Sequence, residues 1–372
     1  AAEVMKLTRM GKFDMDTPAT GLMAWLKKLR GKPDAKSNES GVRATAGEKQ
    51  MRMLRRLPKL LRFIPGTAQD VRAYFLTLQY WLAGSEQNVA GMVKMLVDRY
   101  ADGPRRGLRG LCKPPAPAEY PEVGVYHPRM AGPDVGVAVV AQRMSDQLAA
   151  LPKVATSGTR GTVGVLLMRS YLLAGNAAHY DGVITALEAR GLRVIPAFAT
   201  GLDSRPAIDR YFFAAGQTVV DAVVSLTGFS LVGGPAYNDS KAAEEVLARL
   251  DVPYLAVTPV EFQTLETWGG SERGLLPVEN TMMVAIPELD GSTGPMVYGG
   301  RADANGTACT GCSRACQFVL AENEHDMRVC SERADALAAR VGKLVDLRRS
   351  ERANRKVRSE EHTSELQSPL NI

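Results

Sequence analysis

Strand-like and helix-like stretches alternate along the middle of the chain, and this alternation restricts the fold more than any other feature. A continuous apolar run, typical of a strand buried on both faces, occupies 161–168, and further strands are predicted over 192–198, 222–226 and 252–257. The intervening stretches 177–190, 206–215 and 239–250 have helical patterns. Strands that alternate with helices form βαβ units with right-handed crossovers. The sequence therefore predicts an α/β fold built on a Rossmann-like parallel sheet.

Helices are expected before this region and additional strands after it. Apolar residues recur at helical spacing in 66–83 and again in 85–100, with Gly84-Ser85 between the two predicted helices. A proline-rich connector follows, with a short predicted strand at 123–126. Beyond the alternating region, 281–286 and 294–298 predict two added strands joined by a hairpin across Asp290-Gly291.

These patterns divide the chain into segments of different character. We expect a helical N-terminal segment over 1–102, the connector over 103–153 and the Rossmann-like part over 154–300. A segment with a cysteine cluster and a helix is expected over 301–357.

Several side chains follow the predicted strands, where open α/β sheets bind their ligands. The candidates for contact with a flat, partly apolar ligand are Arg169, Tyr171, Asn176, His179, Phe229, Glu261 and Gln263. Each of them can instead be a helix cap or a packed residue at the rim, and that alternative stays open. No nucleophile motif accompanies His179, so the sequence assigns no catalytic residue.

The glycine-rich stretch Gly228–Gly234 follows a predicted strand but matches neither the dinucleotide fingerprint nor the Walker A motif. No Walker A motif occurs in the 372 residues. If ATP drives the activity, this chain offers no P-loop to bind it.

Four cysteines late in the chain indicate a metal site. Cys309, Cys312 and Cys316 have C-x₂-C-x₃-C spacing, and Cys330 follows. Thiolates are soft ligands that suit zinc or an iron–sulfur cluster, and the C-x₃-C step favours a cluster, such as 4Fe–4S. Unpaired cytosolic cysteines are the alternative, and the isolated Cys112 is expected to be inert.

Charge and hydropathy exclude some other classes. Residues 1–62 hold 15 Lys and Arg against 6 Asp and Glu, but they lack interleaved aromatic residues and any known nucleic-acid module. A solvated helical face is the favoured interpretation, with no nucleic-acid partner and at most peripheral membrane contact. No apolar run approaches the ~20 residues that span a bilayer, and we expect a cytoplasmic protein.

Three motifs resemble the large, porphyrin-binding subunits of magnesium chelatases. They are Ser170–Ile184, Leu226–Ala236 and Pro259–Gln263. The earlier stretch Phe63–Ala83 resembles the segment that links the N-terminal domain of those subunits to the chelatase body. The cysteine set resembles that of the bacteriochlorophyll branch.

The resemblance implies a function. Such a subunit holds protoporphyrin IX while Mg²⁺ is inserted, and two partners, an AAA+ ATPase subunit and its companion, supply ATP hydrolysis. This is the committed step of (bacterio)chlorophyll synthesis. The alternatives are a cobaltochelatase large subunit, which is not expected to share Phe63–Ala83, and a metal-cluster interaction module without chelatase activity.

The resemblance ends near Val357. The following stretch Arg358–Ser368 looks like a translated sequencing adapter, so we expect 358–372 to be an artefact. Together with the non-Met residue Ala1, this predicts an internal fragment whose catalytic residues lie beyond 357 and which is inactive alone.

Overall fold

The computed structural model describes residues 58, 61–63, 66, 68–130, 140–153, 158–234, 237–303 and 326–355. All of them belong to one compact unit, Arg52–Ile372. Within these residues, none of the helices is both long and apolar enough to cross a membrane.

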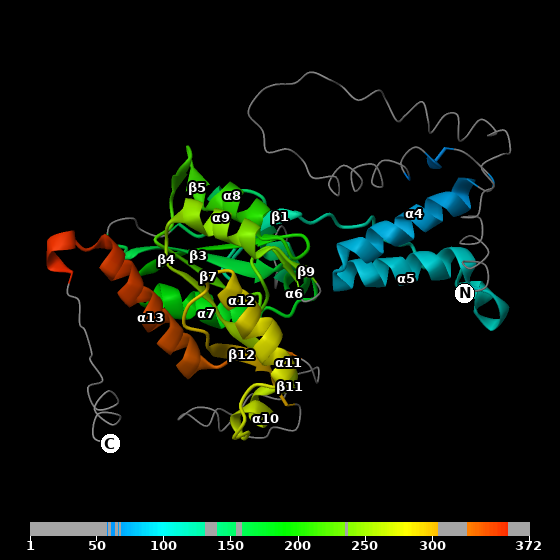
Figure 1. The fold of residues 1–372 in the computed structure, drawn as a ribbon. Helices are drawn as coiled ribbons and strands as arrows, with labels where there is room; N and C mark the ends of the chain where they lie inside the picture. Colours follow the sequence, from blue (N-terminus) through cyan, green and yellow to red (C-terminus); the bar gives the residue numbers. More distant parts are fainter. Residues whose placement is uncertain are drawn as a thin grey trace, which may run out of the picture. The chain divides into compact units, whose positions relative to one another are not determined.

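Two antiparallel helices, α4 (Ala68–Ala83) and α5 (Glu86–Tyr100), confirm the prediction for 66–100 (Figure 1). Ser85 is the N-cap of α5, and its side chain accepts a hydrogen bond from the N–H of Asn88 at 3.2 Å. The cap satisfies a backbone donor that the first turn of a helix leaves free. The connector begins with a 3₁₀ turn at Gly103–Leu108 and leads to strand β1 (Val123–Tyr126).

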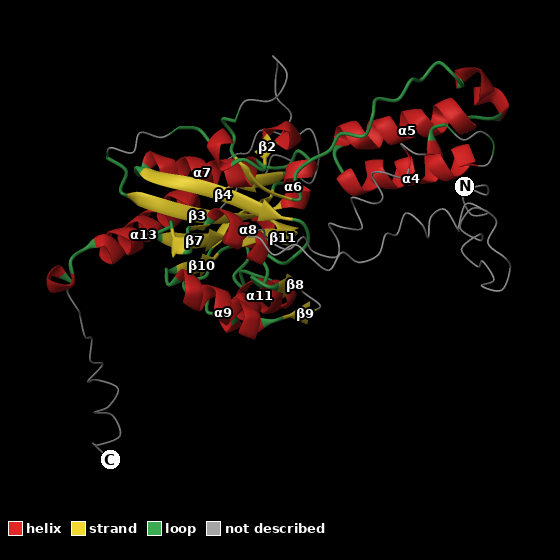
Figure 2. Ribbon diagram, turned by 90° about the horizontal axis from the view of Figure 1, so that it is seen from above, coloured by secondary structure: helices red, strands yellow, loops and turns green. Residues whose placement is uncertain are grey.

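A six-stranded sheet forms the centre of the α/β body, with strand order β10-β7-β3-β4-β1-β2 (Figure 2). Its parallel strands are β3 (Gly161–Met168), β4 (Leu192–Ala199), β7 (Ala222–Ser225) and β10 (Tyr254–Ala256). β1 pairs antiparallel with β4, and β2 (Met144–Ser145) completes that edge. The α/β prediction is confirmed, with the parallel strands where the apolar runs placed them.

Helices cover both faces of this sheet. α7 (Ala178–Ala189) and α13 (Ser331–Arg349) lie on one face, and α8 (Arg205–Tyr211) and α9 (Ser240–Leu250) lie on the other (Figure 1). Asp239 caps α9 as predicted, whereas α8 ends at Tyr211, four residues before the predicted end.

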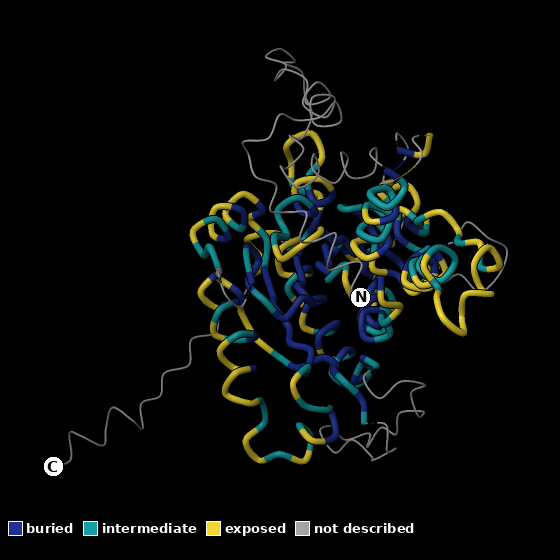
Figure 3. The backbone as a smooth tube through the Cα atoms, turned by 90° about the vertical axis from the view of Figure 1, so that its right-hand side faces the viewer, coloured by how far each residue is buried: buried dark blue, intermediate teal, exposed yellow. Residues whose placement is uncertain are grey.

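Side chains of β3 alternate between the two layers of the core. Val163, Val165 and Leu167 belong to the cluster on the α7 side, and Leu166 belongs to the other. The backbone through the middle of the body is accordingly buried (Figure 3). Gly164 lies against the ring of Phe212, where an added Cβ would be 2.6 Å from the nearest ring atom. Glycine is therefore required for Phe212 to pack on the middle of the strand.

A smaller, three-stranded sheet follows the body in sequence. It contains β11 (Thr258–Thr264), β12 (Val297–Arg301) and β13 (Met327–Val329), and α10 (Leu265–Gly269) follows β11. The remaining short elements are α6 (Arg169–Leu173), β5 (Phe213–Ala214), β6 (Gln217–Thr218), β8 (Gly233–Gly234), β9 (Tyr237–Asn238) and 3₁₀ turns at Val140–Arg143, Leu148–Ala150 and Arg352–Asn354.

The strand and hairpin predicted around 281–286 are wrong. This stretch is a π-helical turn (Thr281–Ala285) between α11 (Pro277–Asn280) and α12 (Ile286–Leu289). Pro277 starts the helical run, and the carboxylate of Glu279 folds back to accept the N–H of Leu276 at 2.9 Å. This helix-start signal outweighs the apolar run Met282–Ala285, which by itself fits a strand or a buried helix equally well. The strand predicted at 294–298 is β12, displaced by three residues at each end.

Candidate functional site

The strand order creates a crevice at the carboxyl edge of the six-stranded sheet. β4 lies on one side of β3 and β7 lies on the other, so the loops that leave β3 and β7 diverge. Open α/β sheets bind ligands at such a switch point. This is the edge at which the candidate side chains were predicted.

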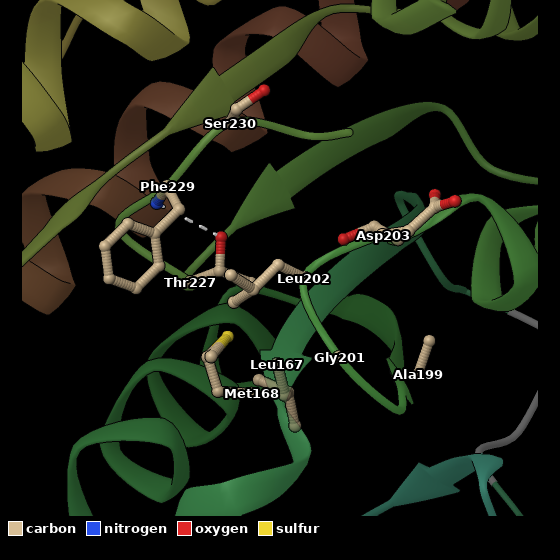
Figure 4. Close-up of a pocket in the computed structure, with 10 residues that line it drawn as sticks. Leu167, Met168, Ala199, Gly201, Leu202, Asp203, Thr227, Phe229 and Ser230 are labelled. Carbon is tan, nitrogen blue, oxygen red and sulfur yellow. Dashed lines mark hydrogen bonds between the residues drawn. The ribbon is translucent and has the colours of Figure 1, made fainter. Parts of the chain in front are cut away.

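The crevice is almost filled by the protein itself. A cavity of about 10 Å³, close to the space needed for one water molecule, remains among the ends of β3, β4 and β7. Leu202 and Phe229 line it together with Thr227 (Figure 4). The N–H of Phe229 donates to Thr227 Oγ1 at 3.4 Å, and Thr227 Oγ1 is 2.9 Å from Ser225 Oγ. The structure thus places Phe229 in the crevice.

Asp290 holds the loop after β7 in position. Its Oδ2 atom accepts hydrogen bonds from Ser230 Oγ at 2.7 Å and from the N–H of Leu231 at 2.8 Å. Asp290 is 2% exposed, so the two bonds form away from competing water. They fix the glycine-rich loop Gly228–Gly234, which matches no known ligand-binding motif, to the end of α12.

Three buried aromatic side chains, His179, Tyr180 and Tyr298, and the partly exposed Tyr171 form a group beside the crevice, which we call the tyrosine–histidine cluster. The His179 ring centroid is 3.8 Å from that of Tyr180, 5.0 Å from that of Tyr171 and 6.1 Å from that of Tyr298. The hydroxyl of Tyr298 donates to the carbonyl of Leu226 at 3.0 Å, which ties β12 to the end of β7.

His179 is fully buried within this cluster, and neither ring nitrogen has a hydrogen-bond partner among the described residues. Burial disfavours the charged imidazolium and lowers the pKa of His179 to about 3. A neutral, enclosed imidazole cannot reach a ligand in this conformation. The structure therefore gives His179 a packing position, the alternative that the sequence left open.

Glu261 lies next to the cluster and has a perturbed carboxyl group. Burial raises its pKa, whereas a hydrogen bond with Tyr171 and the positive charge of Arg301 act in the opposite direction. Burial also raises the pKa of the Tyr171 hydroxyl. The structure thus joins Tyr171 and Glu261, predicted from separate loops, into one half-buried acid–phenol pair.

Three other candidates have their polar groups engaged in the fold. Arg169 Nε donates to the carbonyl of Pro121 at 2.7 Å and attaches the connector to the body. Asn176 Oδ1 accepts the N–H of Met327 at 2.9 Å. Gln263 Nε2 donates at 2.6 Å to Glu279 Oε2, and Glu279 is itself completely buried.

The predicted metal site falls mostly outside the described residues, because Cys309, Cys312 and Cys316 lie in 304–325. Cys330 is described and is 1% exposed at the start of α13. Its backbone N–H donates to the carbonyl of Tyr298 at 2.9 Å, which places it beside the tyrosine–histidine cluster. The described part of the chain contains no group of three or more His, Cys, Asp or Glu side chains that could hold a metal ion.

Sequence reasoning missed Tyr180, Tyr298, Arg301 and Glu279. Tyr180 could have been found from its position beside His179 in the helix. Tyr298 and Arg301 lie on β12, and the parallel pairing of β11 with β12, which was not predicted, brings them to the site. Glu279 was missed because no helix was predicted over 277–280, and the adjoining stretch 281–286 was predicted as a strand.

The fold and this edge define a doubly wound α/β protein with a crevice at the switch point and a helical hairpin before it. The chain belongs to the CobN/magnesium chelatase family, whose model matches residues 78–359. A domain of unknown function, DUF3479, matches residues 1–75.

Individual relatives agree with this assignment. The chain is 52% identical over 355 residues to the magnesium-chelatase H subunit of Cereibacter sphaeroides, covering 95% of this chain and 28% of the relative. It is 50% identical to the corresponding protein of Rhodobacter capsulatus, with the same coverage. These matches confirm the resemblance to bacteriochlorophyll-type H subunits.

A solved structure has a similar fold. The catalytic subunit of cobaltochelatase from Mycobacterium tuberculosis matches with a TM-score of 0.50 at 19% identity, covering 76% of this chain and 20% of that one. At this identity, the match supports the α/β fold alone.

Proposed function

We propose that the chain is part of a magnesium chelatase large subunit that holds protoporphyrin IX in the cytoplasm during Mg²⁺ insertion. In this proposal, an AAA+ ATPase subunit and its companion hydrolyse the ATP. The 52% identity over 95% of the chain to a magnesium-chelatase H subunit carries the proposal. The absence of a Walker A motif from the sequence is consistent with ATP hydrolysis on a partner.

Among the seven candidate residues, Tyr171, Phe229 and Glu261 are the best placed to contact the macrocycle. Each is partly exposed, whereas His179 is enclosed and the side chains of Arg169, Asn176 and Gln263 are hydrogen-bonded within the fold. The aromatic rings of Tyr171 and Phe229 can pack against a flat apolar ligand. Insertion of Mg²⁺ releases two pyrrole protons, and the raised pKa of Glu261 suits its carboxylate to accept one of them.

A segment exchange tests this function, because the chain covers 28% of its relative. Residues of this chain replace the matching segment of the C. sphaeroides protein, and Mg-protoporphyrin formation is followed by fluorescence with partner subunits and ATP. We expect activity comparable to that of the parent. The parent carrying the matching cobaltochelatase segment is the control. A folded exchange protein that binds no porphyrin would contradict the proposal.

The same exchange protein tests the proposed contacts. Glu261→Gln is expected to lower the rate of Mg²⁺ insertion more than porphyrin affinity, because it removes a proton acceptor and retains the shape. Glu266→Gln is the control, since Glu266 is also buried but accepts the N–H of Asp303. Equal effects of the two variants would remove Glu261 from the proposed site.

We further propose that Cys309, Cys312, Cys316 and Cys330 ligate a 4Fe–4S cluster. The buried position of Cys330 is consistent with a shielded cluster, and four thiolates are a suitable donor set. Protein purified without oxygen should contain iron and show thiolate–iron absorbance. Cys312→Ser should lose both, while Cys112→Ser should retain them. Unchanged iron and zinc contents in Cys312→Ser would contradict this ligand set.

A further inference from the structure

A second cavity lies away from the switch point, in the N-terminal helical part. A groove of about 1040 Å³ runs between α4, α5 and the connector. Cavities that enclose organic ligands are typically about 300–1,000 Å³ and mostly apolar, with a few polar groups that orient the ligand. The groove reaches the upper end of this range, so its lining determines what it could hold.

Hydrogen bonds hold the walls of the groove together. The hydroxyl of Tyr80 donates to the carbonyl of Pro115, and Asn88 exchanges two hydrogen bonds with the backbone of Ala118, at 3.0 and 2.8 Å. Asp98 Oδ1 accepts the N–H of Gly110 at 2.8 Å. These bonds fix the connector along the hairpin, so the groove between them is preformed.

The lining combines apolar surface with positive charge. Its apolar part includes Phe63, Leu76, Tyr80, Met95, Pro114 and Pro117. Its charged residues are Arg62, Arg72, Arg99, Asp98 and Glu119, an excess of one positive charge. Phe63 is 83% exposed and adds a large aromatic surface to the lining.

The three arginines are not equivalent. Arg99 forms an ion pair with Asp70, with Nη2 and Oδ1 3.0 Å apart. Arg72 has no ion pair within the described residues, and its Nε donates to the carbonyl of Pro58 at 3.2 Å. This bond orients the guanidinium and leaves its terminal nitrogens available. Arg62, on the segment that Gln69 fastens to α4, likewise has no carboxylate partner within the described part of the chain.

We propose that this groove binds an apolar organic molecule that carries two carboxylates. Its apolar body lies against Leu76, Tyr80 and Met95, and its carboxylates pair with Arg62 and Arg72. Guanidinium groups suit this role because they bind carboxylates through two parallel hydrogen bonds. The groove is distinct from the switch-point crevice, and this inference does not depend on the proposed function.

A porphyrin and a linear aliphatic diacid both carry two carboxylates on an apolar body, and separate titrations distinguish them. The 372-residue chain is titrated with protoporphyrin IX, followed by porphyrin fluorescence, and with hexadecanedioic acid, followed by calorimetry. The dimethyl ester of each probe serves as a control without charge. We expect at least one diacid to bind, and its ester to bind at least about 10-fold more weakly, since each lost charge-assisted contact is equivalent to roughly one order of magnitude in affinity.

Variants locate the binding. Arg62→Gln and Arg72→Gln together should weaken the diacid by about 10-fold or more and leave the ester unaffected. Arg105→Gln, on the exposed 3₁₀ turn outside the groove, should change neither. Far-UV circular dichroism checks that each variant is folded.

Other outcomes would overturn the proposal. They are an absence of binding by both diacids, equal binding of acid and ester, or undiminished diacid affinity in the folded double variant. Porphyrin binding that depends on Glu261 and not on the two arginines would also overturn it, while supporting the proposed function.

Discussion

Replacing His179 with phenylalanine tests the burial of the tyrosine–histidine cluster. The pKa of His179 falls from 6.5 to about 3 because the ring is fully buried and has no hydrogen-bond partner among the described residues. The unfolded chain takes up a proton near pH 6.5, whereas the folded chain does not do so until near pH 3. The free energy of unfolding is therefore unaffected by His179 well above pH 6.5 and decreases as the pH falls below it.

The expected size of this effect follows from the two pKa values. At pH 5.0, roughly 97% of unfolded chains carry this proton, compared with about 1% of folded chains. Linkage then gives a loss of about 2 kcal/mol in the free energy of unfolding between pH 7.5 and 5.0. His179→Phe keeps a planar ring among the tyrosines and cannot titrate. The native chain should therefore lose about 2 kcal/mol more than the variant over this interval.

Urea unfolding at pH 7.5 and 5.0 measures the difference. Trp268, in α10, reports on the body when Trp25 and Trp81 are replaced by phenylalanine in both proteins. Ile184→Val, a buried change on the same helix, is the control and should cost about 1 kcal/mol at both pH values. The reasoning is refuted if His179→Phe shifts stability by the same amount at pH 7.5 and 5.0.

Three further substitutions test other parts of the structure. Asp290→Ala leaves two buried donors of the loop after β7 unpaired. It should lower the free energy of unfolding by about 2–4 kcal/mol in urea titrations. A loss below about 1 kcal/mol would contradict the bonds described. Gly164→Ala brings a methyl group against Phe212 and should destabilise the body by about 1–3 kcal/mol. Adding Phe212→Leu should recover part of this loss, and strictly additive losses would rule out the contact. Arg169→Met removes the hydrogen bond to Pro121 and should accelerate chymotryptic cleavage within 101–122, whereas an unchanged cleavage rate would show that this bond does not restrain the connector.

The sequence was sufficient to predict the strands of the α/β body, because these strands are buried on both faces. Such strands consist of continuous apolar residues, as in 161–168, and helices of ordinary length separate them. The same rule failed for 281–286, where a short apolar run belongs to a half-exposed helix. β11 was missed for a related reason, since Pro259, Glu261 and Gln263 interrupt its apolar pattern.

Arg169, Tyr171 and Phe229 follow strands of the six-stranded sheet, whereas Glu261 and Gln263 lie within β11 of the smaller sheet. The roles of these candidates depend on partners far away in sequence. Glu261 meets Tyr171 across about ninety residues, and Gln263 meets Glu279 through a helix that was not predicted. A sequence pattern shows which strand a side chain follows. It does not show whether another segment supplies a hydrogen-bond partner, and this decides between a side chain that binds a ligand and one that holds the fold.

Among the described residues, the switch-point crevice and the groove beside α4 and α5 differ greatly in volume, which suits them to different ligands. At the switch point, Phe229 and Leu202 occupy most of the crevice and leave a cavity of about 10 Å³. Asp290 fixes the loop that carries Phe229. A large ligand can enter there only if Phe229 or the loop that carries it moves, and the buried bonds of Asp290 oppose movement of the loop. The groove beside α4 and α5 already has about 1040 Å³, and two of its arginines, Arg62 and Arg72, have no carboxylate partner among the described residues. Asp290→Ala should therefore ease access at the crevice and leave diacid binding in the groove unchanged, so this one variant separates the two sites.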